Sequence, residues 1–249
     1  MSNDKKVLVI VCTYNEKDNI GNLVFKILEH APDVNVLIID DNSPDGTGLI
    51  ADNLAAGDNR VTALHREGKL GLGTAQVFGL NWAARNGYDA AVTMDADFSH
   101  DPIVIPEMIK AGDEHDYIIG SRYIPGGKTV NWGLHRKLLS RGGNIFAKTL
   151  LRIPANDLTT GFRYLNLHRL QDIRLDLVRA HGYGFFIEST FRVIAAGIVP
   201  FEVPIVFMDR QFGQSKMSMS IATEELGLVF RLWREKRNKR SFEKPEQTI

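Results

Sequence analysis

The first 121 residues alternate short apolar runs with stretches in which apolar residues recur at helical spacing. Residues 7–13 form a continuous run rich in valine and isoleucine, which is typical of a strand buried on both faces of a sheet. After it, Ile20, Leu23, Val24 and Ile27 follow the i, i+3, i+4 spacing of an amphipathic helix. Four such strand–helix units in a row favour an α/β fold with a mostly parallel, doubly wound sheet. The later units predict strands at 34–40, 61–64 and 90–94, and helices over 49–54, 71–85 and 102–111.

The second half of the chain is less regular. After an apolar run at 117–121, a glycine-rich stretch over 122–132 predicts a long loop. We expect a single domain over residues 1–220, followed by an amphipathic helix and a basic tail over 221–249. Its remaining elements are predicted as helices over 135–151, 188–196 and 221–240, strands at 162–167 and 199–206, and a polar loop over 209–220.

The composition is that of an ordinary globular protein, with 44% hydrophobic and 24% charged residues in a chain of 249. Its 30 basic and 30 acidic side chains give a formal net charge of zero, which argues against a nucleic-acid partner. The single cysteine, Cys12, excludes an internal disulfide framework and fits a reducing compartment. Because the apolar runs are far shorter than the roughly 20 residues that span a bilayer, we expect a cytoplasmic protein, soluble or peripheral on the membrane face.

The charges are spread unevenly along the chain. From Arg231 to the C-terminus there are seven basic and three acidic residues, so the rest of the chain is mildly acidic. A solvated tail is one interpretation of this segment. Contact with anionic lipid headgroups is the other, because the tail adjoins the apolar face of the predicted 221–240 helix.

Polar side chains follow the first four predicted strands at the point where each one ends. They occupy residues 13–16, 40–43, 65–69 and 95–101. The carboxyl ends of parallel strands meet at one edge of the sheet, and doubly wound sheets bind ligands there. These four segments are therefore expected to line a common crevice.

Asp95 and Asp97 come directly after a buried strand, with Ser99 two residues further on. Two carboxylates at this spacing can share one divalent cation through oxygen ligands, and Mg²⁺ or Mn²⁺ would take substrate phosphate as further ligands. The alternative is a pair of surface or capping acids before the Pro102 helix. The position at a strand end favours the metal site.

The other strand ends offer groups for a nucleoside. Asp40 and Asp41 end the second strand, where a carboxylate is placed to bind a ribose hydroxyl or a base edge, although residues 40–46 also form a strong turn signal. Tyr14 and Glu16 follow the first strand, where a ring and an acid could hold a base and its sugar. Gly71 and Gly73 do not follow the first strand, so a dinucleotide-binding fingerprint is rejected.

Basic residues concentrate in the second half, and each alone is compatible with a solvated charge. Several of them around one crevice would form a site for a diphosphate and a second phosphate. His100 lies beside the carboxylates as a candidate base or a structural residue. The basic residues are Arg122, Arg136, Arg141, Arg163, Arg210 and Lys216.

Eight segments of the chain resemble motifs of a known family. Those at 12–16, 39–47, 70–75 and 94–100 are similar to motifs of the family-2 glycosyltransferases, which have the GT-A fold. Those at 120–123, 139–144, 157–163 and 209–216 narrow the resemblance to the polyprenol (dolichol) phosphate mannose synthases within that family. The match runs in order from about residue 7 to residue 220.

The resemblance implies GDP-mannose as donor, a polyprenyl phosphate as acceptor, Mg²⁺ or Mn²⁺ as metal, and a membrane surface or anchoring partner. It assigns Asp97 to the metal, with Asp95 and Ser99 as further ligands. Arg210 and Lys216 would grip the donor diphosphate, and Arg122, Arg136 and Ser140 would face the acceptor phosphate; Asp97, Arg122, Arg210 and Lys216 would be catalytic. The nucleoside side of the donor site would comprise Cys12, Tyr14, Glu16, Ile39, Asp41, Asp95 and Ala96.

The implied reaction inverts the anomeric carbon as the acceptor phosphate attacks it. A phosphate oxygen is already anionic near neutral pH, so no strong general base is required. Two alternatives remain open from the residues alone. One is a transferase that uses UDP-glucose with the same lipid, and the other is a silent nucleotide-sugar binding protein.

Overall fold

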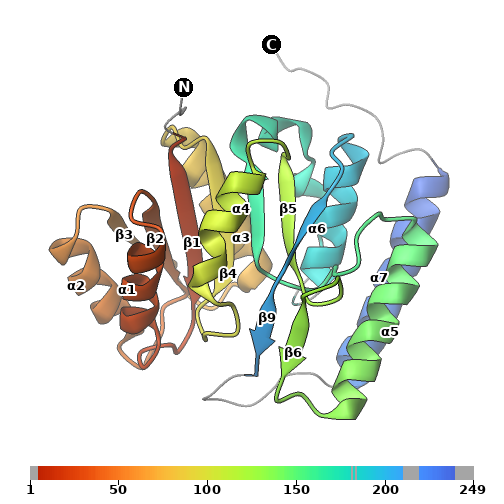
Figure 1. Ribbon diagram of the computed structural model, residues 1–249, viewed down its shortest axis with the longest axis horizontal. Coiled ribbons are helices and arrows are strands. Elements are labelled where there is room, and N and C mark those ends of the chain that lie inside the picture. Colours follow the sequence, from red (N-terminus) through yellow and green to blue (C-terminus); the bar gives the residue numbers. More distant parts are fainter. Residues whose placement is uncertain (1–4, 181, 183, 210–218, 239–249) are drawn as a thin grey trace.

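A computed structural model of the chain describes residues 5–180, 182, 184–209 and 219–238. Seven strands form one sheet in the order β3-β2-β1-β4-β7-β5-β8, and β6 and β9 form a separate two-stranded ribbon (Figure 1). The strands are β1 (Val7–Thr13), β2 (Asn35–Asp40), β3 (Val61–His65), β4 (Ala90–Asp95), β5 (Tyr117–Ser121), β6 (Lys128–Val130), β7 (Arg163–Asn166), β8 (Phe201–Pro204) and β9 (Val206–Met208).

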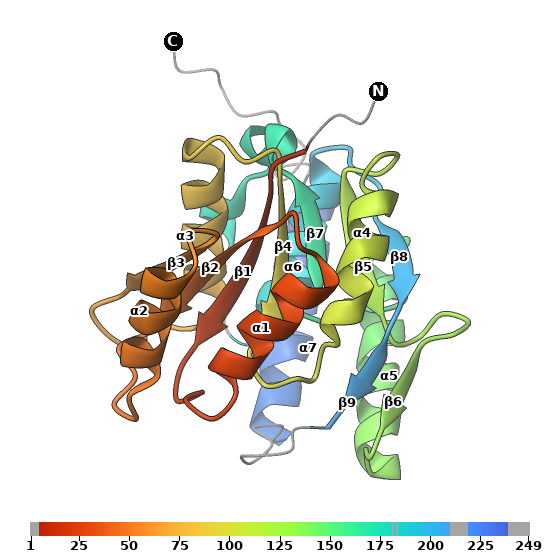
Figure 2. The ribbon, with the colours of Figure 1, turned by 60° about the vertical axis from the view of Figure 1, so that its left-hand side comes forward.

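Helices cover both faces of the sheet, as Figure 2 shows for α1 and α4 in front and α3 behind. Successive residues of β1 alternate between two cores. Val7, Val9 and Val11 pack with one set of helices, while Leu8 and Ile10 pack with the other. The first set is α1 (Ile20–His30), α2 (Thr47–Gly57) and α4 (Ile105–Ala111), and the second is α3 (Leu72–Arg85), α5 (Leu134–Leu151), α6 (Gly184–Ala195) and α7 (Met219–Arg237).

The predicted α/β class and mostly parallel sheet are confirmed. Strands β1, β2, β3 and β4 pair in parallel, with the register Cys12 to Ile39 on one side and Cys12 to Asp95 on the other. Asp101 caps the turn that follows, because its carboxylate accepts a hydrogen bond from the Ile103 amide at 3.1 Å. A short 3₁₀ turn over Pro102–Val104 then leads into α4.

The second half departs from the prediction in three places. Strand β7 lies between β4 and β5 and is antiparallel to both. The predicted loop over 122–132 contains β6. The predicted strand over 199–206 is two strands, because the chain leaves the sheet at Ile205, whose amide donates to the Ser121 carbonyl at 2.9 Å, and continues as β9 in the ribbon.

Helix α7 packs against the body of the protein. Leu228, Val229 and Leu232 are buried in the same core as α3 and α6. Arg231 donates to both oxygens of the buried Glu188 carboxylate at 3.0 Å, and Lys236 donates to the Leu151 carbonyl at 2.7 Å. Arg231 and Lys236, two basic residues of the segment for which lipid contact was one interpretation, therefore contact the folded body of the protein. In the described part of the chain, the helices are all too short or too polar to cross a membrane.

Candidate active site

The carboxyl ends of β1, β2 and β4 meet where the strand order reverses. The chain passes from β1 outward to β2 and β3, and then returns to place β4 on the other side of β1. Sheets with such a reversal bind ligands beside the loops at that point, which here are the loops that follow β1 and β4. The structure thus brings the loops carrying Tyr14, Asp41 and Asp97 to one edge of the sheet, as predicted (Figure 1).

The two carboxylates at the end of β2 have different surroundings. Asp40 is buried and accepts hydrogen bonds from the Thr13 hydroxyl and the Ser43 amide, both at 2.9 Å. It therefore ties the β1 end to the turn after β2. Asp41 points to the next loop instead, and its Oδ2 accepts from the Leu70 amide at 3.1 Å and the Gly71 amide at 3.2 Å.

Arg66 completes the surroundings of Asp41. Its Nη1 lies 2.9 Å from Asp41 Oδ1, and its Nη2 donates to the Thr74 hydroxyl at 2.6 Å. The guanidinium thus joins the end of β2 to the first turn of α3. Since Arg66 follows β3 directly, it is a further charged group at the crevice, and the sequence prediction gave it no role.

Cys12 and Ile39 are neighbours in the register of β1 and β2, but their side chains differ in exposure. Cys12 is half-buried, and burial together with the Asp41 carboxylate raises the pKa of its thiol far above the ordinary value. Ile39 is fully buried and belongs to the core beneath α3. The side chain of Ile39 therefore supports the floor of the predicted nucleoside site.

Tyr14 and Glu16 lie on the loop after β1. The Lys69 ammonium lies 4.0 Å from the centre of the Tyr14 ring, which brings the loop after β3 over the loop after β1. Glu16 is anchored at its backbone, where its amide donates to the Thr47 hydroxyl at 2.9 Å, and its carboxylate accepts from the Asn19 amide group at 2.8 Å. Both predicted nucleoside residues border the same crevice as Asp41.

The carboxylate loop after β4 is tightly folded. Asp97 accepts a hydrogen bond from the Ser99 amide at 3.0 Å, and Phe98 between them has a φ of 59° in the left-handed region. Ala96 is buried in the core. The loop thus holds the Asp97 carboxylate at a fixed position after the strand.

These residues fit a divalent cation held jointly with substrate. The Asp95 side chain is one-quarter exposed, and the buried Ser99 hydroxyl has no hydrogen-bond partner. Among the described residues, no three His, Cys, Asp or Glu side chains cluster as a complete cage. Asp95, Asp97 and Ser99 would therefore supply only part of a shell that Mg²⁺ or Mn²⁺ completes with water and phosphate oxygens.

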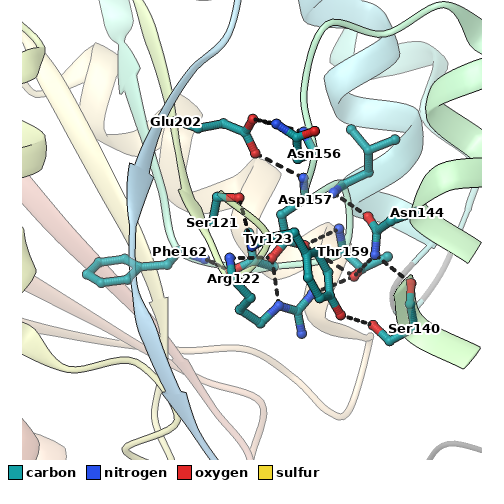
Figure 3. A network of polar contacts seen from close by, with 12 residues as sticks. Ser121, Arg122, Tyr123, Ser140, Asn144, Asn156, Asp157, Thr159, Phe162 and Glu202 are labelled. Atoms are coloured by element: carbon teal, nitrogen blue, oxygen red, sulfur yellow. Dashed lines mark hydrogen bonds and ion pairs between the residues drawn. The ribbon is translucent and has the colours of Figure 1, made fainter. Parts of the chain in front are cut away.

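A buried network of polar contacts surrounds Arg122 and Ser140, two of the predicted acceptor-phosphate residues (Figure 3). Arg122 is 5% exposed and grips the fully buried Asp157 carboxylate through Nε at 2.6 Å and Nη2 at 2.7 Å. Its Nη2 also donates to the Thr159 hydroxyl at 2.7 Å. This bidentate pairing lowers the pKa of Asp157 despite the cost of burial.

Ser140 is the second predicted acceptor residue, and it joins the same network. Its hydroxyl accepts a hydrogen bond from the Tyr123 phenol at 2.7 Å, and its carbonyl accepts from the Asn144 side chain at 2.9 Å. Asn144 in turn accepts from the Leu158 amide at 2.6 Å. The first half of α5 is thereby attached to the loop that carries Asp157.

Arg136 lies at the beginning of α5, where it stacks on Trp132 with 4.0 Å between the guanidinium carbon and the ring centre. Its Nη1 donates to the Asp209 carboxylate at 2.8 Å. Asp209 immediately precedes Arg210, which together with Lys216 was predicted to bind the donor; both basic residues lie outside the described residues. The roles of these three basic residues stay predictions.

Several residues of this site had no predicted role. Asp157 and Thr159 orient Arg122, and Glu202 on β8 accepts from the amides of Asn156 and Asp157 at 2.9 and 3.0 Å. The 157–163 motif indicated that this segment belongs to the site, but it did not predict that Asp157 pairs with Arg122. Glu202 had no such signal.

The fold and the site define a glycosyltransferase. Residues 8–173 match the family model "Glycosyl transferase family 2", so the chain belongs to this family. Its mostly parallel sheet between helices is the GT-A fold, which it shares with a mannosyltransferase from Pyrobaculum calidifontis solved with GDP-Man and Mn²⁺. That structure has a TM-score of 0.59 at 18% identity, over 96% of this chain and 66% of the other.

Two curated relatives match nearly the whole chain. One is the undecaprenyl-phosphate mannosyltransferase of Micrococcus luteus, which is 42% identical over 226 residues, or 91% of this chain and 93% of the relative. The other is the polyprenol monophosphomannose synthase of Mycolicibacterium smegmatis, which is 42% identical over 89% of this chain and 84% of the relative. These relatives agree with the group within the family that the sequence motifs resemble.

Proposed function

We propose that this protein transfers mannose from GDP-mannose to a polyprenyl phosphate, with inversion at the anomeric carbon. The observation that carries the proposal is the pairing of two sites at one sheet edge. A carboxylate loop suited to a metal–diphosphate follows β4, and an arginine–hydroxyl network follows β5 (Figure 3). The names of both curated relatives support the mannosyl and polyprenyl assignments.

In this proposal, each side chain has a positional task. Tyr14, Glu16 and Asp41 hold the nucleoside, and Asp95 and Asp97 hold the divalent cation. The cation would supply positive charge beside the diphosphate that leaves. Mn²⁺ together with GDP-Man in the structurally similar mannosyltransferase supports this assignment.

Arg122, Arg136 and Ser140 would orient the acceptor phosphate toward the sugar. Asp157 and Thr159 fix the direction of the Arg122 guanidinium, so little side-chain entropy remains to be lost when the acceptor binds. The Asp157 carboxylate is engaged by that guanidinium and has a lowered pKa, which makes it a poor proton acceptor. An acceptor that is already ionised matches such a site.

A membrane contact through α5 follows from the same proposal. Leu134 and Leu138 are 72% and 65% exposed on the first turns of α5, and Arg141 follows on the same face. Figure 1 places α5 beside α7 at one edge of the molecule, with the start of α5 on the same side as the carboxyl end of β1. An apolar helix face flanked by basic residues would rest on the anionic headgroups of the cytoplasmic membrane face.

A transfer assay tests the activity. The protein is incubated with labelled GDP-mannose, polyprenyl phosphate and Mg²⁺ or Mn²⁺, and label entering the organic phase is measured. We expect transfer from GDP-mannose and little from labelled UDP-glucose. Efficient transfer from UDP-glucose alone would replace the mannosyl assignment with the glucosyl one, and no transfer from either donor would refute both.

Vesicle sedimentation tests the membrane contact. Leu134→Glu with Leu138→Glu should strongly reduce binding to vesicles that contain anionic lipid. Leu49→Glu is the matched control, because Leu49 is 71% exposed on α2, away from the proposed contact. Equal binding by the double variant and the control would exclude the α5 face.

A further inference from the structure

His100 lies in a buried aromatic column between the two halves of the site. Its side chain is fully buried and stacks on Phe162 with 5.1 Å between ring centres and an interplanar angle of 28°. On its other side, the ring meets Phe207 edge-on at 5.3 Å. Phe207 in turn meets Trp132 at 5.4 Å, on which Arg136 stacks. The column thus reaches from the carboxylate loop to an arginine on the acceptor side.

Both ring nitrogens of His100 have a defined neighbour. The Asp95 amide donates to Nδ1 at 3.1 Å, and Nε2 lies 3.3 Å from the Thr160 hydroxyl. An amide proton pointing at Nδ1 requires that this nitrogen be unprotonated, so the Nε2–H tautomer faces Thr160. The ring is therefore held as a neutral acceptor for the backbone at the end of β4.

The hydrogen bond from Asp95 to His100 closes the loop that carries the carboxylates. The loop turns back within five residues, and its Ser99 carbonyl accepts from the Met208 amide of β9 at 3.3 Å. On the other side, Gly161 packs so closely that a Cβ there would lie 2.9 Å from Asp95 Oδ1. The Asp95 carboxylate is confined between a fixed backbone and the Gly161 chain segment.

We propose that His100 is a positioning residue, whose Nδ1 holds the backbone at Asp95 so that the carboxylates of Asp95 and Asp97 meet one divalent cation. The proposal rests on the metal–diphosphate site of the proposed function. It assigns His100 no proton transfer, since its ring is enclosed by Phe162, Phe207 and the loop. Groups that orient metal ligands without touching the metal change metal affinity by about 10- to 100-fold.

Two substitutions separate the Nδ1 contact from the rest of the ring. His100→Asn keeps an acceptor near the Nδ1 position, whereas His100→Gln places its amide near the Nε2 position. Mn²⁺ binding in the presence of GDP is measured by the electron paramagnetic resonance signal of free Mn²⁺. We expect the Asn variant to stay within about threefold of the wild type and the Gln variant to bind at least about tenfold more weakly.

Thr160→Val is the matched control, because it removes the partner of Nε2 and leaves the Asp95 contact intact. Its Mn²⁺ affinity should stay within about threefold of the wild type. Equal weakening in the Asn and Gln variants would overturn the proposal in favour of ring packing, and unchanged affinity in both would overturn it altogether. Thermal unfolding of each variant establishes that the folded protein is being compared.

Nitrogen-15 NMR of the wild type labelled at histidine gives a test that needs no variant. At neutral pH, we expect an unprotonated Nδ1 and a protonated Nε2 for His100. A protonated Nδ1 would contradict the proposal directly. Neither the Mn²⁺ affinity nor the tautomer is measured through sugar transfer. If the transfer assay fails but His100→Gln still binds Mn²⁺ more weakly, the proposed substrates are refuted and the role of His100 is retained.

Discussion

The ion pair between Arg122 and Asp157 provides a quantitative test of how the acceptor side is built. Asp157→Asn keeps the shape of the side chain and one acceptor oxygen but removes the charge that compensates a guanidinium that is only 5% exposed. Removing one partner of a buried pair costs about 3–5 kcal/mol, because the other charge stays buried without compensation. For a protein of this length, such a loss lowers the melting temperature by about 10 °C.

Denaturant unfolding monitored by circular dichroism measures this loss of stability. Asp176→Asn is a matched control, since Arg174 contacts both Asp176 oxygens at 2.9 and 2.8 Å but on the surface, with 38% and 62% of the two side chains exposed. An exposed pair contributes at most about 1 kcal/mol. The two variants break the same bidentate geometry, so the difference between them reports burial together with the backbone amides of Arg122 and Thr159 that donate to Asp157.

A double-mutant cycle with Arg122→Met decides whether the charges are coupled. We expect the double variant to be more stable than the sum of the single losses predicts, by about 2 kcal/mol or more. Additive losses within about 0.5 kcal/mol, or an Asp157→Asn variant no less stable than the Asp176→Asn control, would refute the reasoning.

Further predictions concern the carboxylate loop and the nucleoside side. Asp97→Asn should abolish turnover with an unchanged circular dichroism spectrum; an active variant would contradict the metal assignment. Gly161→Ala should raise the Mn²⁺ concentration needed for half-maximal rate about tenfold, since its Cβ would lie 2.9 Å from Asp95 Oδ1. Burial lowers the pKa of His100 to about 4 against about 6.5 in an unfolded chain. Between pH 6.5 and 4 the wild type should therefore lose about 2.5 kcal/mol more stability than His100→Asn in denaturant titrations, and equal losses would contradict a buried neutral ring. GDP should slow modification of Cys12 by a thiol reagent; equal rates would place Cys12 outside the nucleoside site.

The first half of the fold, residues 7–95, was predictable from sequence because its signals are local. Continuous apolar runs locate β1, β2, β3 and β4 to within a residue at each end, and the helical spacing locates α1 and α3. Strand order reversal then brings the polar ends of these strands together. The positions of Tyr14, Glu16, Asp41 and Asp97 around one crevice follow from that topology.

The second half of the fold was less predictable because its determinants are distant in sequence. Arg122 and Asp157 are 35 residues apart, and Glu188 and Arg231 are 43 apart. A charge pattern cannot say whether a basic residue is solvated, binds a ligand or neutralises a buried acid. The antiparallel direction of β7 is likewise set by pairing with β4 and β5 rather than by its own four residues.

The position of β7 in the sheet affects the state of the chain while it is being synthesised. Residues 7–95 form four adjacent parallel strands that can pair as soon as they are synthesised, but β4 gains its second neighbour only when residues 163–166 are available. Until then the newly made chain has an open, apolar strand edge, the kind of edge that pairs with other chains. β7 therefore covers the open edge of β4, and a chain stopped before residue 163 should aggregate as it leaves the ribosome.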